Sequence, residues 1–260
     1  MLYGYSIQGG YVMNDSVKVS KNPGHVLEPR VQLKGVSKYY QMGKIQVVAL
    51  REISLEIMEG EFVVFLGPSG SGKTTLLNLI GGLDYPDEGQ IIVNGIDITQ
   101  LTASRLTAFR RTQVGFIFQF FNLIPTLTAK ENVEFAAELV KPHMSAKELL
   151  REVDLDERIN HFPSELSGGE NQRVAIARAL STDPSVILCD EPTGSLDFNT
   201  GKRIFKLLRV LNEEKLKTVV VVTHNSSIGE IANRVVYLRD GRIADVIKNE
   251  QPLDPDKLKW

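Results

Sequence analysis

Apolar runs and helical patterns alternate over the second half of the chain. The segments SVILCD (185–190) and TVVVVTH (218–224) are apolar almost throughout, which is typical of strands covered on both faces. Apolar residues at helical spacing occupy the neighbouring segments GGENQRVAIARALS (168–181) and TGKRIFKLLRVLNEE (200–214). Strands that alternate with helices in this way predict an α/β fold, with a parallel sheet between two layers of helices.

The first part of the chain has a different pattern, in which short strands follow one another without helices between them. It runs from RVQLKGVSKYYQ (30–41) to ALREISLEIMEGEFVVFLG (49–67), and EGQIIVNGIDI (88–98) adds a strand pair. The Asn94-Gly95 pair suits the tight turn of a hairpin, because both residues tolerate positive φ. We therefore expect an antiparallel β layer that leads into the parallel core.

Shorter segments complete the pattern. TASRLTAFRRT (102–112) predicts a short helix with Thr102 as its cap, and VGFIFQ (114–119) predicts a buried strand. At the end of the chain, SSIGEIANR (226–234) predicts a short helix, and two strands are expected over 235–247.

The interval between residues 120 and 163 is helical in character. Three consecutive stretches, 126–140, 145–153 and 155–162, have helical spacing and little strand between them. This predicts a helical lobe, about 120–163, inserted in the α/β core. Residues 1–28 lack a clean period and carry Gly, Asn, Ser and Pro, so we expect a flexible extension followed by one folded domain, 29–260.

Composition narrows the possible partners. Hydrophobic residues make up 42% and charged residues 24% of the 260 residues, an ordinary globular balance. A net charge of −2 provides no global basic field, so no nucleic-acid partner is expected. The single cysteine excludes an internal disulfide and fits a reducing compartment. Because no run is long enough to cross a membrane, and no basic-then-apolar leader opens the chain, we expect a cytosolic protein that another component would hold at any membrane.

The glycine-rich stretch FLGPSGSGKTT (65–75) carries the clearest chemistry. Gly67, four further residues and then Gly72-Lys73-Thr74 form the P-loop pattern, with a strand pattern before it and a helix pattern after it. Glycines let backbone N–H groups converge on a phosphate chain, and the helix start favours an anion. A glycine-rich turn without a ligand is the alternative. The predicted phosphate-binding residues are Gly67, Pro68, Ser69, Gly70, Ser71, Gly72, Lys73, Thr74 and Thr75.

Lys73 is expected to reach the β- and γ-phosphates, and the Thr74 hydroxyl to bind Mg²⁺.

A second group of polar residues follows the two apolar strands 185–190 and 218–224. Asp190 and Glu191 follow the first of them, and ligands of open α/β sheets lie at such strand ends. Asp190 suits the Mg²⁺ shell, and Glu191 suits the base that activates an attacking water. The alternative is that both acids only begin a solvated loop.

His224 ends the second strand at the same edge, where it has either a structural role or a contact with the γ-phosphate or the water. Cys189 is interpreted as a packing residue.

The stretch LSGGENQR (166–173) predicts a second anion-binding helix start, about a hundred residues after the first. One nucleotide cannot easily use both loops of one subunit. An ordinary glycine-rich helix cap is the alternative. The residues concerned are Ser167, Gly168, Gly169 and Glu170.

Together, GPSGSGKTT, Gln119 in GFIFQ, LSGGE, ILCDEP, SLD and TH resemble the ordered motifs of ABC-type ATPase domains over about residues 30–247. The resemblance implies a RecA-like parallel-sheet core, and two domains paired head to tail with each ATP between one P-loop and the partner's LSGGE loop. It also implies that Ser167, Gly168 and Gly169 grip the γ-phosphate in trans, and that Gln119 contacts Mg²⁺ or the water.

By the same resemblance, Asp197 lies across the dimer seam, and Tyr40 stacks on adenine, with Tyr39 as the fallback. PTGSLD (192–197) resembles the form common in lipoprotein-release and macrolide-export subfamilies, although Asn171 stands where Gln is usual and the lobe is a few residues short. The expected function is thus that of an energy-coupling ATPase on the cytoplasmic side of a membrane, working on a separate permease. The apolar residues and proline of FFNLIPTLTAKENV (120–133), next to Gln119, predict the surface on which that permease docks, with ordinary packing in the lobe as the alternative. A nucleic-acid or repair ATPase and a soluble scaffold ATPase of iron–sulfur assembly are the alternatives.

Overall fold

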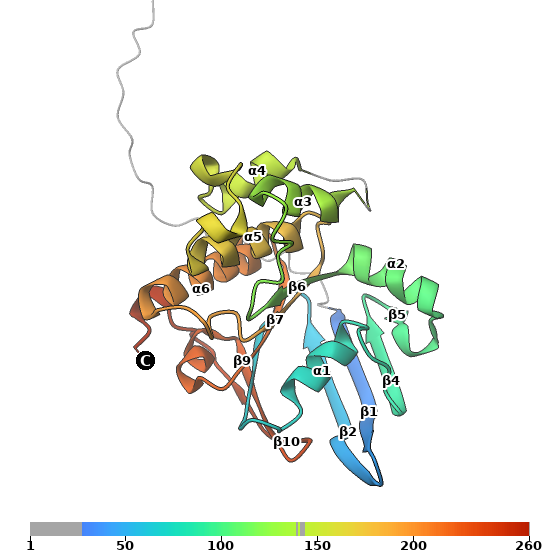
Figure 1. The fold of residues 1–260 in the computed structure, drawn as a ribbon. Helices are drawn as coiled ribbons and strands as arrows, with labels where there is room; N and C mark the ends of the chain where they lie inside the picture. Colours follow the sequence, from blue (N-terminus) through green and yellow to red (C-terminus); the bar gives the residue numbers. More distant parts are fainter. Residues whose placement is uncertain (1–27, 139, 141–143, 260) are drawn as a thin grey trace, which may run out of the picture.

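The computed structural model describes residues 28–138, 140 and 144–259, and these form two sheets with helices around them (Figure 1). The strands are β1 (Pro29–Met42), β2 (Ile45–Met58), β3 (Phe62–Leu66), β4 (Glu88–Val93), β5 (Ile96–Asp97), β6 (Val114–Phe118), β7 (Val186–Asp190), β8 (Thr218–Thr223), β9 (Arg234–Arg239) and β10 (Arg242–Lys248). The α-helices are α1 (Lys73–Ile80), α2 (Ala103–Gln113), α3 (Ala129–Ala137), α4 (Ala146–Glu152), α5 (Gly168–Leu180) and α6 (Phe198–Glu213). The predicted extension, apart from Glu28, lies outside the described residues.

The larger sheet is the parallel core. Its order is β10-β9-β3-β8-β7-β6, in which every neighbouring pair is parallel except β9 with β10. Strands β3 and β8 are buried along their whole length, because helices or the second sheet cover both faces. The predicted α/β fold is therefore confirmed, with one antiparallel strand added at an edge.

Alternate residues of the central strands feed two separate hydrophobic clusters. Phe62 and Val64 of β3 belong to the cluster that contains α5 and α6, whereas Val63 and Phe65 belong to the cluster beneath α1 and the second sheet. This follows from the two-residue period of a strand. Cys189 lies in the first cluster, fully buried, and burial raises the pKa of its thiol. It is a packing residue of the sheet.

The smaller sheet has the order β2-β1-β4-β5 and is antiparallel, as predicted. Asn94 and Gly95 join β4 to β5 with φ of 52° and 73°. Positive φ at both positions is what a type I′ hairpin turn requires. Thr102 also caps α2 as expected, because its side chain accepts from the N–H of Arg105.

The helical lobe contains α3 and α4, which pack against α5 at one end of the molecule (Figure 1). Its apolar residues Val133, Leu149 and Leu150 share the cluster that covers one face of the parallel sheet, so the lobe has no separate core. Thr128 with Glu131, and Ser145 with Glu148, form capping boxes that fix where these two helices begin.

The predicted helix over 155–162 is wrong, since only a 3₁₀ turn forms at Asp156–Arg158. The carbonyls of Ile159 and His161 accept instead from the N–H groups of Lys130 and Ala129, in the first turn of α3. The chain here satisfies the free donors of another helix rather than extending its own. The segment 226–234 likewise contains a 3₁₀ helix, Ser226–Ile231. Among the described residues, no helix is both long and apolar enough to span a membrane.

Candidate nucleotide-binding site

The glycine-rich loop joins the end of β3 to the start of α1. Gly72 caps the helix with φ of 100°, a left-handed conformation that side chains disfavour. A Cβ on Gly67 would lie 2.2 Å from the carbonyl oxygen of Leu238. Glycine is therefore required at both ends of the loop, at one for backbone conformation and at the other for close packing against β9.

Lys73 is the first residue of α1, and its ammonium group curls back over the loop. It donates to the carbonyls of Gly67 at 2.8 Å and Pro68 at 3.0 Å, which leaves one of its three donors for a ligand. Burial lowers the pKa of Lys73, while the nearby carboxylates of Glu191 and Asp190 act to raise it. The loop thus holds one cation between its backbone and two acids.

The second group of predicted residues meets the loop at the end of β7. Thr74 Oγ1 donates to Asp190 Oδ1 at 3.2 Å, although the two residues are 116 positions apart. Burial raises the pKa of Asp190, Glu191 adds to that rise, and the hydrogen bond from Thr74 opposes it. A hydroxyl and a carboxylate oxygen therefore lie side by side at the helix start.

Glu191 is held by its backbone and by both oxygens of its side chain. Its φ is 46°, unusual for a residue other than glycine, and its N–H donates to the carbonyl of Val222 at 3.0 Å. Its Oε2 accepts from Thr223 Oγ1 at 2.8 Å, and its Oε1 accepts from the N–H of His224 at 2.9 Å. Backbone strain of this kind persists only where the surroundings impose it, and it concentrates at functional sites.

His224 completes this cluster, as its Nδ1 lies 2.7 Å from Glu191 Oε1. A carboxylate only accepts hydrogen bonds, so this contact places a proton on Nδ1. The imidazole is 72% exposed whereas the Glu191 side chain is 18% exposed. Sequence reasoning missed Thr223, whose hydroxyl beside a strand-end histidine was the available signal.

A cavity of about 430 Å³ brings most of the predicted residues together. Its wall on one side is the loop and α1, and on the other the ends of β7 and β8. Of the predicted residues, it is lined by Tyr40, Ser69, Gly70, Gly72, Lys73, Thr74, Thr75, Gln119, Asp190, Glu191 and His224. Gly67, Pro68 and Ser71 do not line it. Val47, Val48 and Ala49 of β2 line it as well, which no sequence motif indicated.

The cavity distinguishes Tyr40 from Tyr39, its neighbour on β1. Tyr40 lines it, and its hydroxyl donates to Asp84 Oδ2 at 2.8 Å. Tyr39 does not line it, and its hydroxyl lies 3.3 Å from Glu88 Oε2. Neighbouring residues of a strand point to opposite faces, so only one of the pair can meet a ligand here. The geometry favours Tyr40.

Gln119 links the site to the segment after β7. Its side chain packs so closely on Gly194 that a Cβ there would lie 2.7 Å from Gln119 Nε2. Ser195 Oγ donates to the carbonyl of Gln119 at 3.1 Å. The side chain and the carbonyl of Gln119 thus both contact this segment. Asp197 caps α6 by accepting from the N–H groups of Asn199 and Thr200.

Ser167 lies outside the cavity of its own chain. It caps α5 in a capping box, in which Glu170 Oε2 accepts from Ser167 N at 2.8 Å and from Ser167 Oγ at 2.7 Å. These bonds, aided by Arg158, lower the pKa of Glu170 to about 2 against the effect of burial. Glu170 therefore orients Ser167, while Ser167 and Gly168 remain exposed and Gly169 is packed against Thr200.

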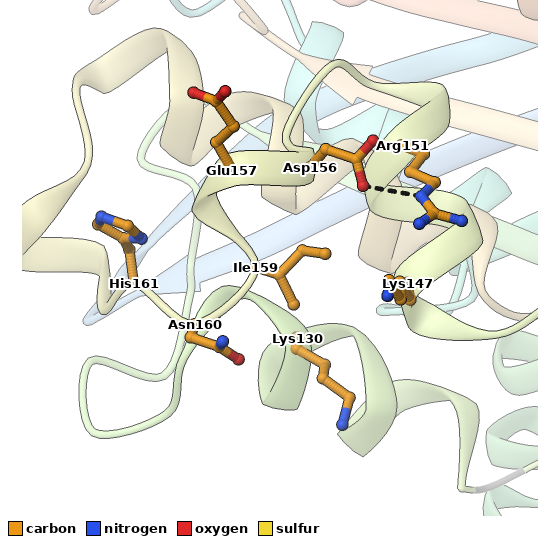
Figure 2. Close-up of a pocket in the computed structure, with 8 residues that line it drawn as sticks. All are labelled: Lys130, Lys147, Arg151, Asp156, Glu157, Ile159, Asn160 and His161. Carbon is orange, nitrogen blue, oxygen red and sulfur yellow. Dashed lines mark hydrogen bonds and ion pairs between the residues drawn. The ribbon is translucent and has the colours of Figure 1, made fainter.

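A second cavity, of about 500 Å³, lies in the helical lobe (Figure 2). Among its charged groups, Arg151 Nε donates to Asp156 Oδ1 at 2.7 Å, and Lys130 lies 3.3 Å from Glu134, which does not line the cavity. None of the predicted site residues lines it. It is not a candidate for the nucleotide.

This chain is similar in sequence to ATP-binding proteins of ABC transporters. The family model described as ABC transporter matches residues 50–194. An uncharacterized ABC transporter ATP-binding protein of Methanocaldococcus jannaschii, MJ0796, is 50% identical over 222 residues, covering 82% of this chain and 94% of the relative. A macrolide export ATP-binding/permease protein of Rhodopirellula baltica is 44% identical over 236 residues, covering 88% of this chain but 34% of that longer protein.

A solved structure of MJ0796, described as a dimeric post-hydrolysis state bound to ADP and Pi, superimposes with a TM-score of 0.78. The two sequences are 48% identical in that comparison, which covers 84% of this chain and 98% of the other. The family model spans the glycine-rich loop, Ser167 and both acids at the end of β7. By its sequence, its fold and the arrangement of its site, the chain belongs to the ABC transporter family, as one of its ATP-binding proteins.

Proposed function

We propose that this chain hydrolyses ATP as the energy-coupling subunit of a membrane transporter, of the export or lipoprotein-release type. Two copies would work head to tail on a separate permease, at the cytoplasmic face of the membrane. The observation that carries the proposal is the convergence of Lys73, the Thr74–Asp190 pair and Glu191 on one cavity. This set provides a cation for the phosphates, a pair of oxygen ligands for a metal ion, and a general base.

The roles follow from the contacts of each group. Lys73 would neutralise the phosphates, since its remaining donor is free of the loop carbonyls. Glu191 would accept the proton of the attacking water, because it is held beside the cavity by Thr223 and His224. His224 would hold Glu191 through its Nδ1–H, and to donate toward the γ-phosphate its largely exposed ring would have to turn that N–H away from Glu191.

Mg²⁺ fits the donor set of this site. Thr74 and Asp190 provide adjacent hydroxyl and carboxylate oxygens, and Gln119 adds an amide oxygen on the same cavity. Mg²⁺ prefers such oxygen ligands, few from the protein, with waters and substrate phosphates completing the shell. When bound, the ion would neutralise charge on the β- and γ-phosphates. Thr74, Asp190 and Gln119 would be the residues that hold it.

The exposed Ser167 supports the dimer. Its helix start can bind an anion, yet it does not line the cavity of its own chain, so it needs a nucleotide held by another copy. The relative MJ0796 is described as dimeric with ADP and Pi. In a head-to-tail pair, Ser167, Gly168 and Gly169 would meet the γ-phosphate bound to the partner's loop, and Asp197 would lie at the seam.

Turnover per subunit is expected to rise with protein concentration, because an isolated subunit lacks the second half of the site. Replacing Ser167 with arginine should abolish hydrolysis while nucleotide binding to the monomer stays near that of the wild type. Phosphate release and equilibrium titration with ATP measure the two quantities.

Ser145→Arg is the matched control. Ser145 forms the same capping box with Glu148 on α4, so its loss costs about as much helix stability, on the order of 1 kcal/mol. Hydrolysis should survive that change. Equal activity of the two variants, or turnover independent of concentration in a protein that sediments as a monomer, would contradict the trans site.

Of the predicted permease-docking residues 120–133, Asn122 lines a groove that we propose as the permease contact. The groove, of about 420 Å³, runs between α2, β6, α3 and α5, and its rim carries Arg110, Arg111 and Arg178. Phe120 and Phe135 are 72% and 56% exposed, and Phe135 precedes the groove residue Ala136 in sequence. Arg178 also donates to the carbonyls of Phe121 and Asn122, which ties the groove to the segment after Gln119.

Filling this groove should release the chain from its permease. Ala136 lines the groove on α3, so Ala136→Arg is expected to abolish co-purification with a multi-span membrane protein and to leave basal ATPase activity intact. Val246→Arg changes an exposed apolar residue of β10, at the opposite edge of the parallel sheet from β6, and should have no effect. If Ala136→Arg still co-purifies with its membrane partner, the permease contact lies elsewhere. If the wild-type chain purifies without any multi-span membrane protein, a scaffold role is favoured.

The nucleic-acid alternative is not supported by the lobe. A chromosome-maintenance ATPase of this kind would carry a long coiled coil between the two anion-binding loops. The described α-helices from the first loop to the second, α1 to α4, have 7 to 11 residues. These are too short for several heptads.

A further inference from the structure

A buried lysine lies next to the nucleotide cavity without lining it. Lys38 is on β1, two residues before Tyr40, and its side chain is 10% exposed. Burial of an ammonium group is unfavourable unless the group is paired. Neither the glycine-rich loop nor the acids at the end of β7 contact it, so its role must come from its own surroundings.

The contacts of Lys38 all converge on Tyr40 and the segment after α1. Lys38 Nζ donates to Asp84 Oδ1 at 3.1 Å and to the carbonyl of Tyr85 at 2.7 Å, and it lies 3.8 Å from Asp87 Oδ2. The same nitrogen lies over the Tyr40 ring, 5.1 Å from its centroid. A cation over an aromatic face is held by the ring quadrupole.

Asp84 joins the lysine to the tyrosine. One of its oxygens accepts from Lys38 and the other accepts from the Tyr40 hydroxyl, at 2.8 Å. Burial acts to raise the pKa of Asp84, but hydrogen bonds from Tyr40, the N–H of Tyr85 and Lys38 outweigh it, so the pKa is lowered. Asp84 is therefore a carboxylate near neutral pH and can accept both bonds.

The Tyr40 ring is thus fixed at two places. Its hydroxyl end is held by Asp84, and one face is covered by Lys38. Tyr40 lines the cavity whereas Lys38 does not. With one face covered by Lys38, only the opposite face of the ring is left for a ligand.

We propose that Lys38 and Asp84 are positioning residues that hold the Tyr40 ring as the platform for the nucleotide base. This rests on the proposed binding of adenine by Tyr40. A ring that is already oriented loses less conformational freedom when the base stacks on it. Lys38 and Asp84 act through Tyr40 and do not touch the phosphates, so they should affect only ligands that carry a base.

Two ligands separate this role from a structural one. Lys38→Met is expected to weaken MgATP binding about five- to tenfold, the scale of coupling between side chains in contact, and to leave the affinity for inorganic tripolyphosphate with Mg²⁺ unchanged. Asp84→Asn and Tyr40→Phe, which remove charge or the hydroxyl alone, should show the same pattern with smaller losses. Lys34→Met changes an exposed lysine of the same strand and is the control for both ligands.

Tyr40→Ala supplies the reference. It should weaken ATP about five- to 150-fold, the scale of base–aromatic stacking, again without effect on tripolyphosphate. Adding Lys38→Met to Tyr40→Ala should cause no further loss, because the platform is already absent. Titration calorimetry measures each affinity, and Tyr40→Phe keeps the test open if Lys38→Met fails to fold.

The positioning role is overturned if Lys38→Met weakens both ligands equally, or if it weakens ATP as much in the Tyr40→Ala background as in wild type. If Tyr40→Ala leaves ATP affinity unchanged while Lys73→Ala abolishes it, the platform itself is wrong but the ATP site is not. The two failures are thereby distinguished.

Discussion

Replacement of Glu191 by glutamine is expected to lower ATP hydrolysis by about 10²–10⁴-fold, the usual range for a lost general base. The change keeps the size of the side chain and one acceptor oxygen, but the amide cannot accept a proton from water. ATP affinity should stay near that of wild type, since Lys73 and the Thr74–Asp190 pair are untouched. Phosphate release under saturating ATP, together with an ATP titration, measures both effects.

Glu61→Gln is the matched control for this variant. Glu61 has a side-chain exposure of 14%, close to the 18% of Glu191, and it pairs with Arg234 outside the cavity. Its loss should lower stability without lowering the hydrolysis rate of the folded protein. If Glu191→Gln hydrolyses ATP near the wild-type rate, the general-base assignment is wrong, and His224 and Gln119 become the candidates for positioning the water.

Lys73→Ala is expected to abolish tight ATP binding. A hydrogen bond to a charged group contributes about 1.5–3 kcal/mol, so a loss of at least about tenfold to 100-fold follows from one such bond alone. The Tyr40 platform and the acids at the end of β7 cannot replace a cation among the phosphates. Binding of a fluorescent ATP analogue to the variant, followed by competition with ATP, measures the loss.

Lys217→Ala provides the comparison, because Lys217 is similarly buried, at 13% side-chain exposure, and pairs with Asp183 away from the cavity. That variant should bind ATP as wild type does. An unchanged ATP affinity of Lys73→Ala would remove the glycine-rich loop from the phosphate site.

Much of the fold follows from local patterns in the sequence. The apolar runs that became β7 and β8 have to be covered on both faces, and the Asn94-Gly95 turn and the Thr102 cap depend only on neighbouring residues. The segment 155–162 failed as a helix because its carbonyls pair with α3, a contact that no local period encodes.

The site residues likewise divide into those that local sequence patterns predict and those that they do not. The loop and the acids at the strand ends were predictable, because spacing and strand ends fix where such residues meet. Thr223, which holds Glu191, and the pair of Lys38 with Asp84 were not, since each depends on side chains far apart in sequence. Only the cavity distinguishes Tyr40, which lines it, from Tyr39, which does not.

In the proposed dimer, ATP is held between the glycine-rich loop of one copy and Ser167 of another. Sedimentation velocity of Glu191→Gln with saturating MgATP tests it most directly, because stalled hydrolysis should trap the closed pair. The expected result is a monomer without nucleotide, a dimer with ATP, and a monomer again when Ser167→Arg is added to the same chain. A Glu191→Gln protein that stays monomeric with ATP bound, or a dimer that survives Ser167→Arg, would contradict the claim.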